Sequence, residues 1–233
     1  MHRRHFIGSS IAASIAIFGG ARRASAATAE SAAKPLTRRA PVKVAFMLGD
    51  GANVIDTAGP WEVFQDTVVE VDGKHRDAFE VFTVGPSEDL LQMTGGLTVK
   101  PRYHVKNAPQ PNVIVIPAQK STKETRAWLA AASAGTDVTM SICTGAFQLA
   151  RAGLLKDLPA TTHHDYFDAF QKEFPDIELR RGLRFVDNGH IASAGGLTSG
   201  IDLALHVVSR YFGMAAAEAT ATYMEYSSDA WRA

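Results

Sequence analysis

This sequence has a single cysteine among 233 residues, no excess of either charge, and no apolar run long enough to cross a membrane. One cysteine cannot form an internal disulfide, so Cys143 is a buried small hydrophobe, half of an intermolecular bridge, or a reactive thiol. The 24 basic and 24 acidic residues give a formal net charge of zero, and no basic stripe with interleaved aromatic residues is present. Nothing therefore indicates a nucleic-acid partner.

The patterns that hold common cofactors are also missing. No set of His, Asp and Glu has the spacing of a metal site, and Gly49-Asp50-Gly51 lacks the third glycine of a dinucleotide-binding fingerprint. We therefore predict no metal and no cofactor, and we expect the partner to be a small-molecule substrate or ligand.

The first 26 residues have the pattern of a twin-arginine signal peptide. Arg3 and Arg4 precede an apolar run at residues 11–18, and residues 24–26 have the small side chains of a cleavage site. The run is well short of the ~20 residues that span a bilayer, and such signals are addresses read by a receptor rather than anchors. The alternative is a disordered or weakly anchoring tail. We expect a periplasmic or secreted protein with no membrane partner once the signal is removed.

The rest of the chain divides into a lead-in at residues 27–41, expected to be disordered, and one domain at residues 42–233. A hydrophobic content of 46% supplies a core without disulfides. Continuously apolar strands separated by helices predict an α/β fold, a mostly parallel sheet with helices on both faces. The predicted strands are 42–48, 79–84, 113–116, 137–142, and a hairpin of 183–186 with 191–194; the predicted helices are one from Pro60 onward, 122–134, 145–155, 165–174, 199–212 and 215–226.

The first predicted helix depends on residue spacing. Trp61, Phe64, Val68 and Val71 recur every three or four residues, as one face of a helix does, and Pro60 suits a first helical turn. Ligands bind beyond the carboxyl ends of the strands in parallel sheets of this kind. The loops after the first, third and fourth of the main strands, which include Asp56, residues 117–120 and Cys143, should therefore meet.

Cys143 lies where a predicted strand changes into a predicted helix. Gly145 follows two residues later and relieves crowding at the sharp turn, which is the logic of a nucleophile elbow. The free N–H groups and the dipole of the following helix favour a thiolate at this place. The alternative is that Cys143 only fills space at the end of the strand.

Four segments in colinear order resemble the DJ-1/PfpI superfamily. They are S-I-C-T-G-A-F at 141–147, I-D-T-A-G-P-W-E-V-F at 55–64, A-T-T-H at 160–163, and A-G-G-L-T-S-G-I-D at 194–202. They are most similar to the branch with isonitrile hydratases and the sensor domains of AraC-type regulators. The resemblance runs from about residue 42 to 226. It implies a flavodoxin-like three-layer sandwich, class I glutamine amidotransferase-like, with a nucleophile elbow at Cys143, and a homodimer.

The resemblance also implies roles for the neighbours of Cys143. The acid at the position of Asp56 is protonated in isonitrile hydratases and donates a hydrogen bond to the sulfur; a carboxyl beside a thiolate should hold its proton more tightly. Taken alone, Asp56 is equally suited to cap a helix. Thr144 is a candidate to bond the sulfur or substrate, or else a helix cap. Protease-like members have histidine at the position of Thr144, so we expect no peptidase activity.

Four further residues are possible accessories of the site. His163 matches a histidine near the cysteine in other members, and Gly196 permits close approach at the pocket rim. The branch usually has Pro-Gly-Gly after the third strand, where this chain has Pro117 followed by Ala118 and Gln119. A positive φ at Ala118 would cost roughly 1 kcal/mol or more, and Gln119 is a candidate to place an amide in the pocket.

Two hypotheses of function follow from the resemblance. The first is a cysteine-dependent hydratase or hydrolase of a small electrophile, an isonitrile hydratase-like lyase with Cys143 as the nucleophile and Asp56 as the acid and base. The second is a non-catalytic periplasmic ligand-binding or redox-sensing protein. A class I glutamine amidotransferase is disfavoured, because no His-x-Glu follows the cysteine.

Overall fold

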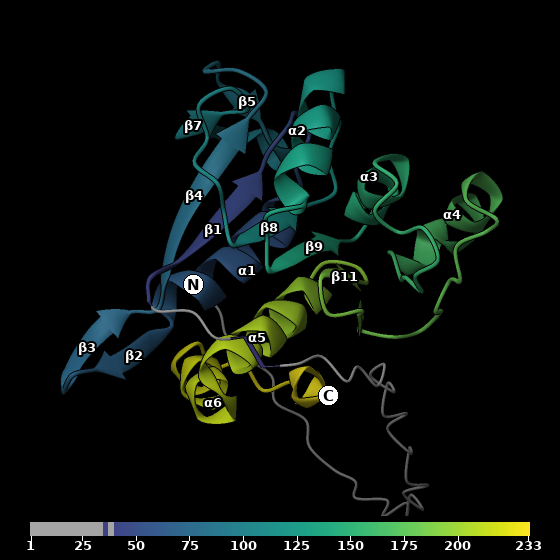
Figure 1. The fold of residues 1–233 in the computed structure, drawn as a ribbon. Coiled ribbons are helices and arrows are strands. Elements are labelled where there is room, and N and C mark those ends of the chain that lie inside the picture. Colours follow the sequence, from purple (N-terminus) through teal and green to yellow (C-terminus); the bar gives the residue numbers. More distant parts are fainter. Residues whose placement is uncertain (1–34, 37–39) are drawn as a thin grey trace, which may run out of the picture.

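A seven-stranded sheet organises the computed structural model, which describes residues 35–36 and 40–233 (Figure 1). The strand order is β10-β11-β9-β8-β1-β4-β7, and neighbours run parallel except β10 and β11. The main strands are β1 (Val42–Met47), β4 (Phe79–Gly85), β7 (Tyr103–His104), β8 (Val113–Ile116), β9 (Val138–Ile142), β10 (Phe185–Asp187) and β11 (Ile191–Ala194). The predicted mostly parallel α/β fold is confirmed.

Helices cover both faces of this sheet. The α-helices are α1 (Val54–Asp66), α2 (Lys123–Ser133), α3 (Gly145–Arg151), α4 (Phe167–Glu173), α5 (Ser199–Phe212) and α6 (Met214–Tyr223), and the 3₁₀ turns are η1 (Thr94–Gly96), η2 (His164–Tyr166) and η3 (Ala230–Arg232). Two separate two-stranded sheets pair β2 (Val68–Val71) with β3 (Lys74–Asp77) and β5 (Leu91–Gln92) with β6 (Thr98–Val99).

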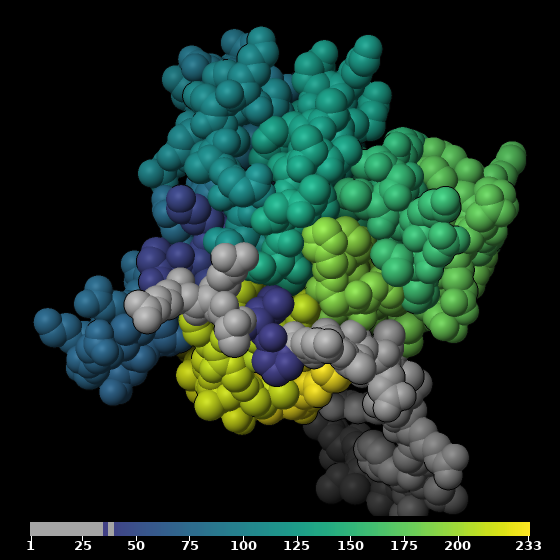
Figure 2. All heavy atoms as spheres, viewed as in Figure 1, coloured from purple at the N-terminus to yellow at the C-terminus, as the bar shows by residue number. Residues whose placement is uncertain are grey.

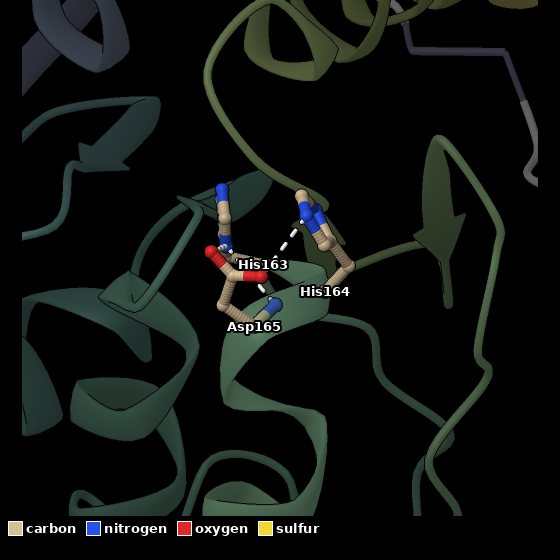
Figure 3. Close-up of side chains that lie close together, drawn as sticks. All are labelled: His163, His164 and Asp165. Atoms are coloured by element: carbon tan, nitrogen blue, oxygen red, sulfur yellow. Dashed lines mark hydrogen bonds and ion pairs between the residues drawn. The ribbon is translucent and has the colours of Figure 1, made fainter.

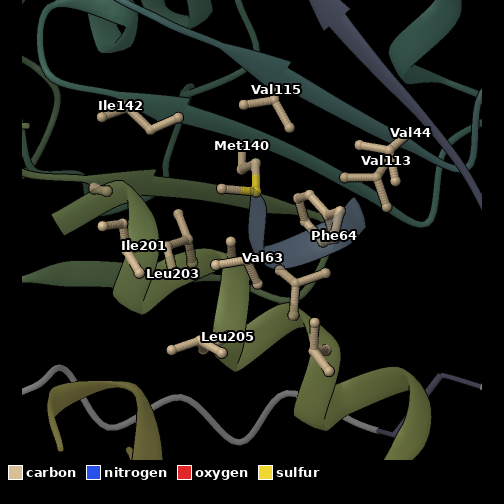
Figure 4. Packing of buried hydrophobic residues seen from close by; sticks show 14 of the residues in the cluster. Val44, Val63, Phe64, Val113, Val115, Met140, Ile142, Ile201, Leu203 and Leu205 are labelled. Carbon is tan, nitrogen blue, oxygen red and sulfur yellow. The ribbon is translucent and has the colours of Figure 1, made fainter. Parts of the chain in front are cut away.

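The core has two main parts, one on each face of the sheet. Successive side chains of a strand point to opposite faces. Val113 and Val115 of β8 accordingly join Phe64 of α1 and Leu203 of α5 in the larger cluster (Figure 4), whereas Ile114 and Ile116 pack with α2, α3 and α4. This alternation explains why a continuous apolar run is needed for a strand that is covered on both sides.

The strand order changes direction at β1, which lies between β4 and β8. Ligand sites in doubly wound sheets form at such a point, beyond the carboxyl ends of the strands. The loops after β1 and β8 are joined there: the Asn53 N–H donates to the Ala118 carbonyl at 2.9 Å, and the Lys120 N–H donates to the Asp50 carbonyl at 3.0 Å. The elbow after β9 adjoins β11, because the Cys143 N–H donates to the Gly195 carbonyl at 2.8 Å.

The predicted helix starting at Pro60 was wrong at both ends. Helix α1 begins at Val54, because the Asn53 side chain accepts hydrogen bonds from the N–H groups of the first turn, and Pro60 lies inside it. Val68 and Val71 belong to β2 instead. Asp72 and Gly73, both at positive φ, turn the chain back into β3. This β2–β3 hairpin stands out from the body of the molecule (Figure 2).

Other boundaries differ by a few residues. Helix α3 ends at Arg151, earlier than predicted, and the predicted helix at 165–174 is a 3₁₀ turn followed by α4. Helix α5 has the predicted bounds. Of the predicted lead-in, Leu36 donates its N–H to the Arg210 carbonyl at 2.7 Å. The predicted signal peptide lies outside the described residues. Within the described part, no helix has the length and apolar character to cross a membrane.

Candidate active site

Cys143 lies between β9 and α3 in a left-handed backbone conformation, with φ of 58°. This conformation costs free energy for any residue other than glycine, and such strained residues are found mostly at functional sites. Its carbonyl accepts a 2.8 Å hydrogen bond from the Thr162 hydroxyl. A Cβ at Gly145 would overlap the Ile116 carbonyl oxygen, so only glycine lets the elbow approach the end of β8 this closely. The structure thus contains the sharp strand-to-helix turn that the sequence predicted.

Asp56 is fully buried in the first turn of α1. Its Oδ2 accepts the Ala118 N–H at 3.1 Å, and its Oδ1 has no hydrogen-bond partner in the described part of the chain. Burial raises the pKa of this carboxyl to about 6, against the opposing effects of the Ala118 N–H, the Leu197 N–H and the Cys143 side chain. The structure therefore places Asp56 in electrostatic contact with Cys143.

The sulfur is affected in the opposite sense from the one expected. Burial, and then the negative charge of Asp56, raise the pKa of the Cys143 thiol to about 11, although the Thr144 N–H, the Leu197 N–H and the Thr144 side chain lower it. We expected helix N–H groups to keep a resting thiolate. The Cys143 side chain is instead a thiol at neutral pH, because it is only 6% exposed and its neighbour is an acid.

Together the two groups hold one proton over a wide pH range. With pKa values of about 6 for Asp56 and about 11 for Cys143, the pair is singly protonated between them. The thiol–carboxylate form and the thiolate–carboxylic acid form differ only by transfer of that proton within the pair. The nucleophilic form can therefore be reached without exchanging a proton with solvent.

Leu197 is a site residue that sequence reasoning missed. Its N–H acts on both the Asp56 carboxyl and the Cys143 sulfur, and it favours the charged form of each. Its φ of 53° is left-handed, which is unusual for a leucine. The leucine side chain gave no signal for this role, since the contact is made by the backbone.

Ala118 and Gln119 make different contacts beside the site. Ala118 supplies the N–H that binds Asp56, and it is not among the described non-glycine residues with positive φ, so the strain considered for it is absent. The Gln119 amide donates to the Met47 carbonyl at 2.6 Å and accepts the Gly49 N–H. That amide thus joins the loop after β8 to the end of β1.

His163 packs against Gly196. A Cβ at Gly196 would overlap the His163 ring and lie 2.8 Å from Nε2. The His163 Nδ1 accepts the Asp165 N–H at 3.2 Å, which caps η2. Figure 3 shows the side chains of His163, His164 and Asp165 close together. Their potential metal-binding atoms all lie within 4.8 Å of one another. Two of the three are exposed, and their proximity follows from being consecutive in a capped turn.

Comparison with known proteins supports the resemblance. The model of the DJ-1/PfpI family matches residues 42–210. An isonitrile hydratase from Pseudomonas putida is 27% identical, over 80% of this chain and 79% of that protein. The HTH-type transcriptional regulator GbdR from Pseudomonas aeruginosa is 27% identical over 77% of this chain and 49% of the regulator, so this chain spans about half the regulator's length.

Solved structures are similar over most of the chain. A ThiJ/PfpI family protein from Pseudomonas syringae superposes with a TM-score of 0.71 and 25% identity, covering 81% of this chain and 76% of the other. An AraC family transcriptional regulator from Pseudomonas putida superposes with a TM-score of 0.65 and 18% identity, covering 79% of this chain and 100% of the other. The second likeness, at its lower identity, concerns the fold alone.

Proposed function

Because this chain belongs to the DJ-1/PfpI family over residues 42–210, we propose that it is a cysteine-dependent hydratase of a small electrophile, with an isonitrile as the substrate class. The observation that carries the proposal is the buried pair of Cys143 and Asp56, which shares one proton around neutral pH. The similarity to an isonitrile hydratase supports the choice of substrate class.

The first step adds the thiol across the terminal isonitrile carbon. The Asp56 carboxylate takes the proton from Cys143 as the sulfur bonds to that carbon, and then delivers the same proton to the carbon. The product is a thioimidate, R–N=CH–S–Cys143. The Leu197 N–H, which acts on both groups, stabilises the negative charge that passes from Asp56 to the sulfur.

The second step consumes water. Asp56 takes one proton from water as the hydroxide oxygen bonds to the thioimidate carbon, and it passes that proton to the nitrogen. Collapse of the resulting R–NH–CH(OH)–S–Cys143 adduct breaks the carbon–sulfur bond and releases an N-substituted formamide, while the proton of the adduct's hydroxyl returns to the Cys143 sulfur through Asp56. The sum is one isonitrile plus one water giving one formamide, and the pair ends in its starting protonation state.

The proposal is tested with a simple alkyl isonitrile, following formamide by NMR. We expect turnover in the unmodified protein and its loss in Cys143→Ala and Asp56→Asn. Glu62→Gln is the matched control, because Glu62 is an exposed acid of the same helix α1. Absence of turnover in the folded, unmodified protein, or equal loss in the control, would overturn the assignment.

A second candidate function is ligand binding without turnover. It is favoured by one observation, the protonated resting thiol of a 6% exposed Cys143, and by the similarity to transcriptional regulators. In that case the isonitrile assay gives no product. Isonitriles would then perturb the NMR signals of the site equally in the unmodified protein and in Cys143→Ala.

A further inference from the structure

A cavity of about 380 Å³ adjoins the elbow, and Asp56 is not among its lining residues. Two of its lining residues, Thr162 and Gly195, also hydrogen-bond the backbone of Cys143, whereas Cys143 itself does not line it. The volume falls in the range of small-ligand pockets. The cavity is therefore next to the candidate active site but separate from the sulfur.

Arg184 is the principal charged group lining this cavity. Its Nε donates to Oδ2 of the buried Asp202 at 2.6 Å, and Nη2 contacts the same oxygen. Nη2 also reaches the Thr198 hydroxyl at 3.2 Å and the Tyr226 hydroxyl at 3.4 Å. Since a guanidinium has five N–H donors, the two on Nη1 have no partner among the described residues. The Arg184 side chain is 28% exposed and lines the cavity.

A second donor lies in the same wall. Ser199, the first residue of α5, lines the cavity and is only 4% exposed, and its hydroxyl has no hydrogen-bond partner in the described part of the chain. It belongs to the first turn of a fourteen-residue helix, where the dipole favours negative charge. The Ser199 hydroxyl oxygen is not one of the fully buried unpartnered atoms of the described residues, so it keeps access to the cavity, where a ligand or water can bond it.

The other residues around the cavity determine which kind of anion it can bind. Phe167, Leu183 and Leu197 line the same cavity with apolar surface, which suits a short hydrocarbon body. Asp202 is fully buried directly behind Arg184 and already compensates one positive charge. This buried carboxylate would repel a dianion such as hydrogen phosphate about twice as strongly as a monoanion at the same place, so the site favours a monoanion.

From these contacts we propose that the cavity binds a small monocarboxylic acid, its carboxylate held by Arg184 Nη1 and the Ser199 hydroxyl, its hydrocarbon part against Phe167 and Leu197. The site shares Leu197 with the Cys143–Asp56 pair but does not include the sulfur, and its ligand need not be a substrate of the reaction proposed for Cys143.

The probe is isobutyrate, titrated into Cys143→Ala at millimolar concentrations and followed by NMR signals of residues 195–199. We expect saturable shifts there, with isobutyramide and inorganic phosphate binding at least tenfold more weakly. Removing one hydrogen bond to a charged group should weaken binding about tenfold in Ser199→Ala. Ser209→Ala, on the same helix with its hydroxyl bonded to the His206 carbonyl at 2.7 Å, is the control.

Three results would overturn the proposal: no saturable shift with isobutyrate, equal affinity for isobutyramide, or equal affinity of the Ser199→Ala and control variants. Arg184→Lys is a second probe, because lysine keeps one charge beside Asp202 while removing Nη1. Its folding is checked by the chemical-shift dispersion before titration. Because all titrations use Cys143→Ala, their outcome does not depend on whether isonitriles are hydrated.

Discussion

The hydroxyl of Thr162 donates a 2.8 Å hydrogen bond to the carbonyl oxygen of Cys143, and the hydroxyl of Thr161 has no partner among the described residues. Both threonines are buried. Thr162→Val removes the shorter of two hydrogen bonds to this carbonyl, which also accepts the Ala146 N–H at 3.4 Å, and should lower the free energy of unfolding by about 1 kcal/mol. Thr161→Val removes an unpaired hydroxyl and should leave the free energy of unfolding nearly unchanged or raise it. Urea denaturation measures the free energy of unfolding of both variants. Equal decreases would contradict the view that the Thr162 hydroxyl stabilises the Cys143 backbone.

The stability of the fold should depend on the ionisation of Asp56. Its pKa is raised from 3.8 when exposed to about 6 when folded, so the folded state holds the proton more tightly and the free energy of unfolding falls as pH rises between these values. The fall should be about 3 kcal/mol and complete above the folded pKa. Subtracting the pH profile of Asp56→Asn isolates this contribution, and a flat difference between the two profiles would rule out the raised pKa.

Activity should depend on pH through the same pair. Reaction needs one shared proton, so kcat/KM for an isonitrile should rise through a pKa near 6 and fall through one near 11. In the plot of kcat/KM against pH, activity rises as the doubly protonated pair loses its first proton. Activity falls at alkaline pH as the pair loses its last proton. An alkaline limb close to the ordinary thiol value of 9.0 would show that neither burial nor Asp56 affects the sulfur.

Gly196 allows a direct test of the contact with His163. A Cβ at Gly196 would overlap the His163 ring, and Gly196 is not among the described glycines with positive φ, so alanine there has no left-handed backbone to adopt. Gly196→Ala should therefore lower the free energy of unfolding by about 1–3 kcal/mol through the overlap alone. The loss should vanish when His163→Ala is added, which urea denaturation of the single and double variants measures. An equal loss in the His163→Ala background would contradict the contact.

Several elements were predictable because they depend on local chemistry. The apolar run Val113–Ile116 needs cover on both faces, and Thr122 caps α2 through its own side chain. The Asp72-Gly73 turn was also present in the sequence. The spacing of Val68 and Val71 predicted a helix there, whereas Val69 and Val71 follow the alternation of a strand and share its half-buried face, and a short window does not distinguish the two periods.

By itself the sequence determined that a cysteine follows a buried strand, with a glycine two residues on that lets the chain turn, and that an acid follows the first strand. Only the tertiary structure decided which protonation state these groups have. Local helix N–H groups favour a thiolate, but burial and the charge of Asp56 outweigh them at Cys143. Desolvation and Coulomb interaction depend on everything packed around a group, and residues from distant parts of the chain, such as Leu197, supply those surroundings.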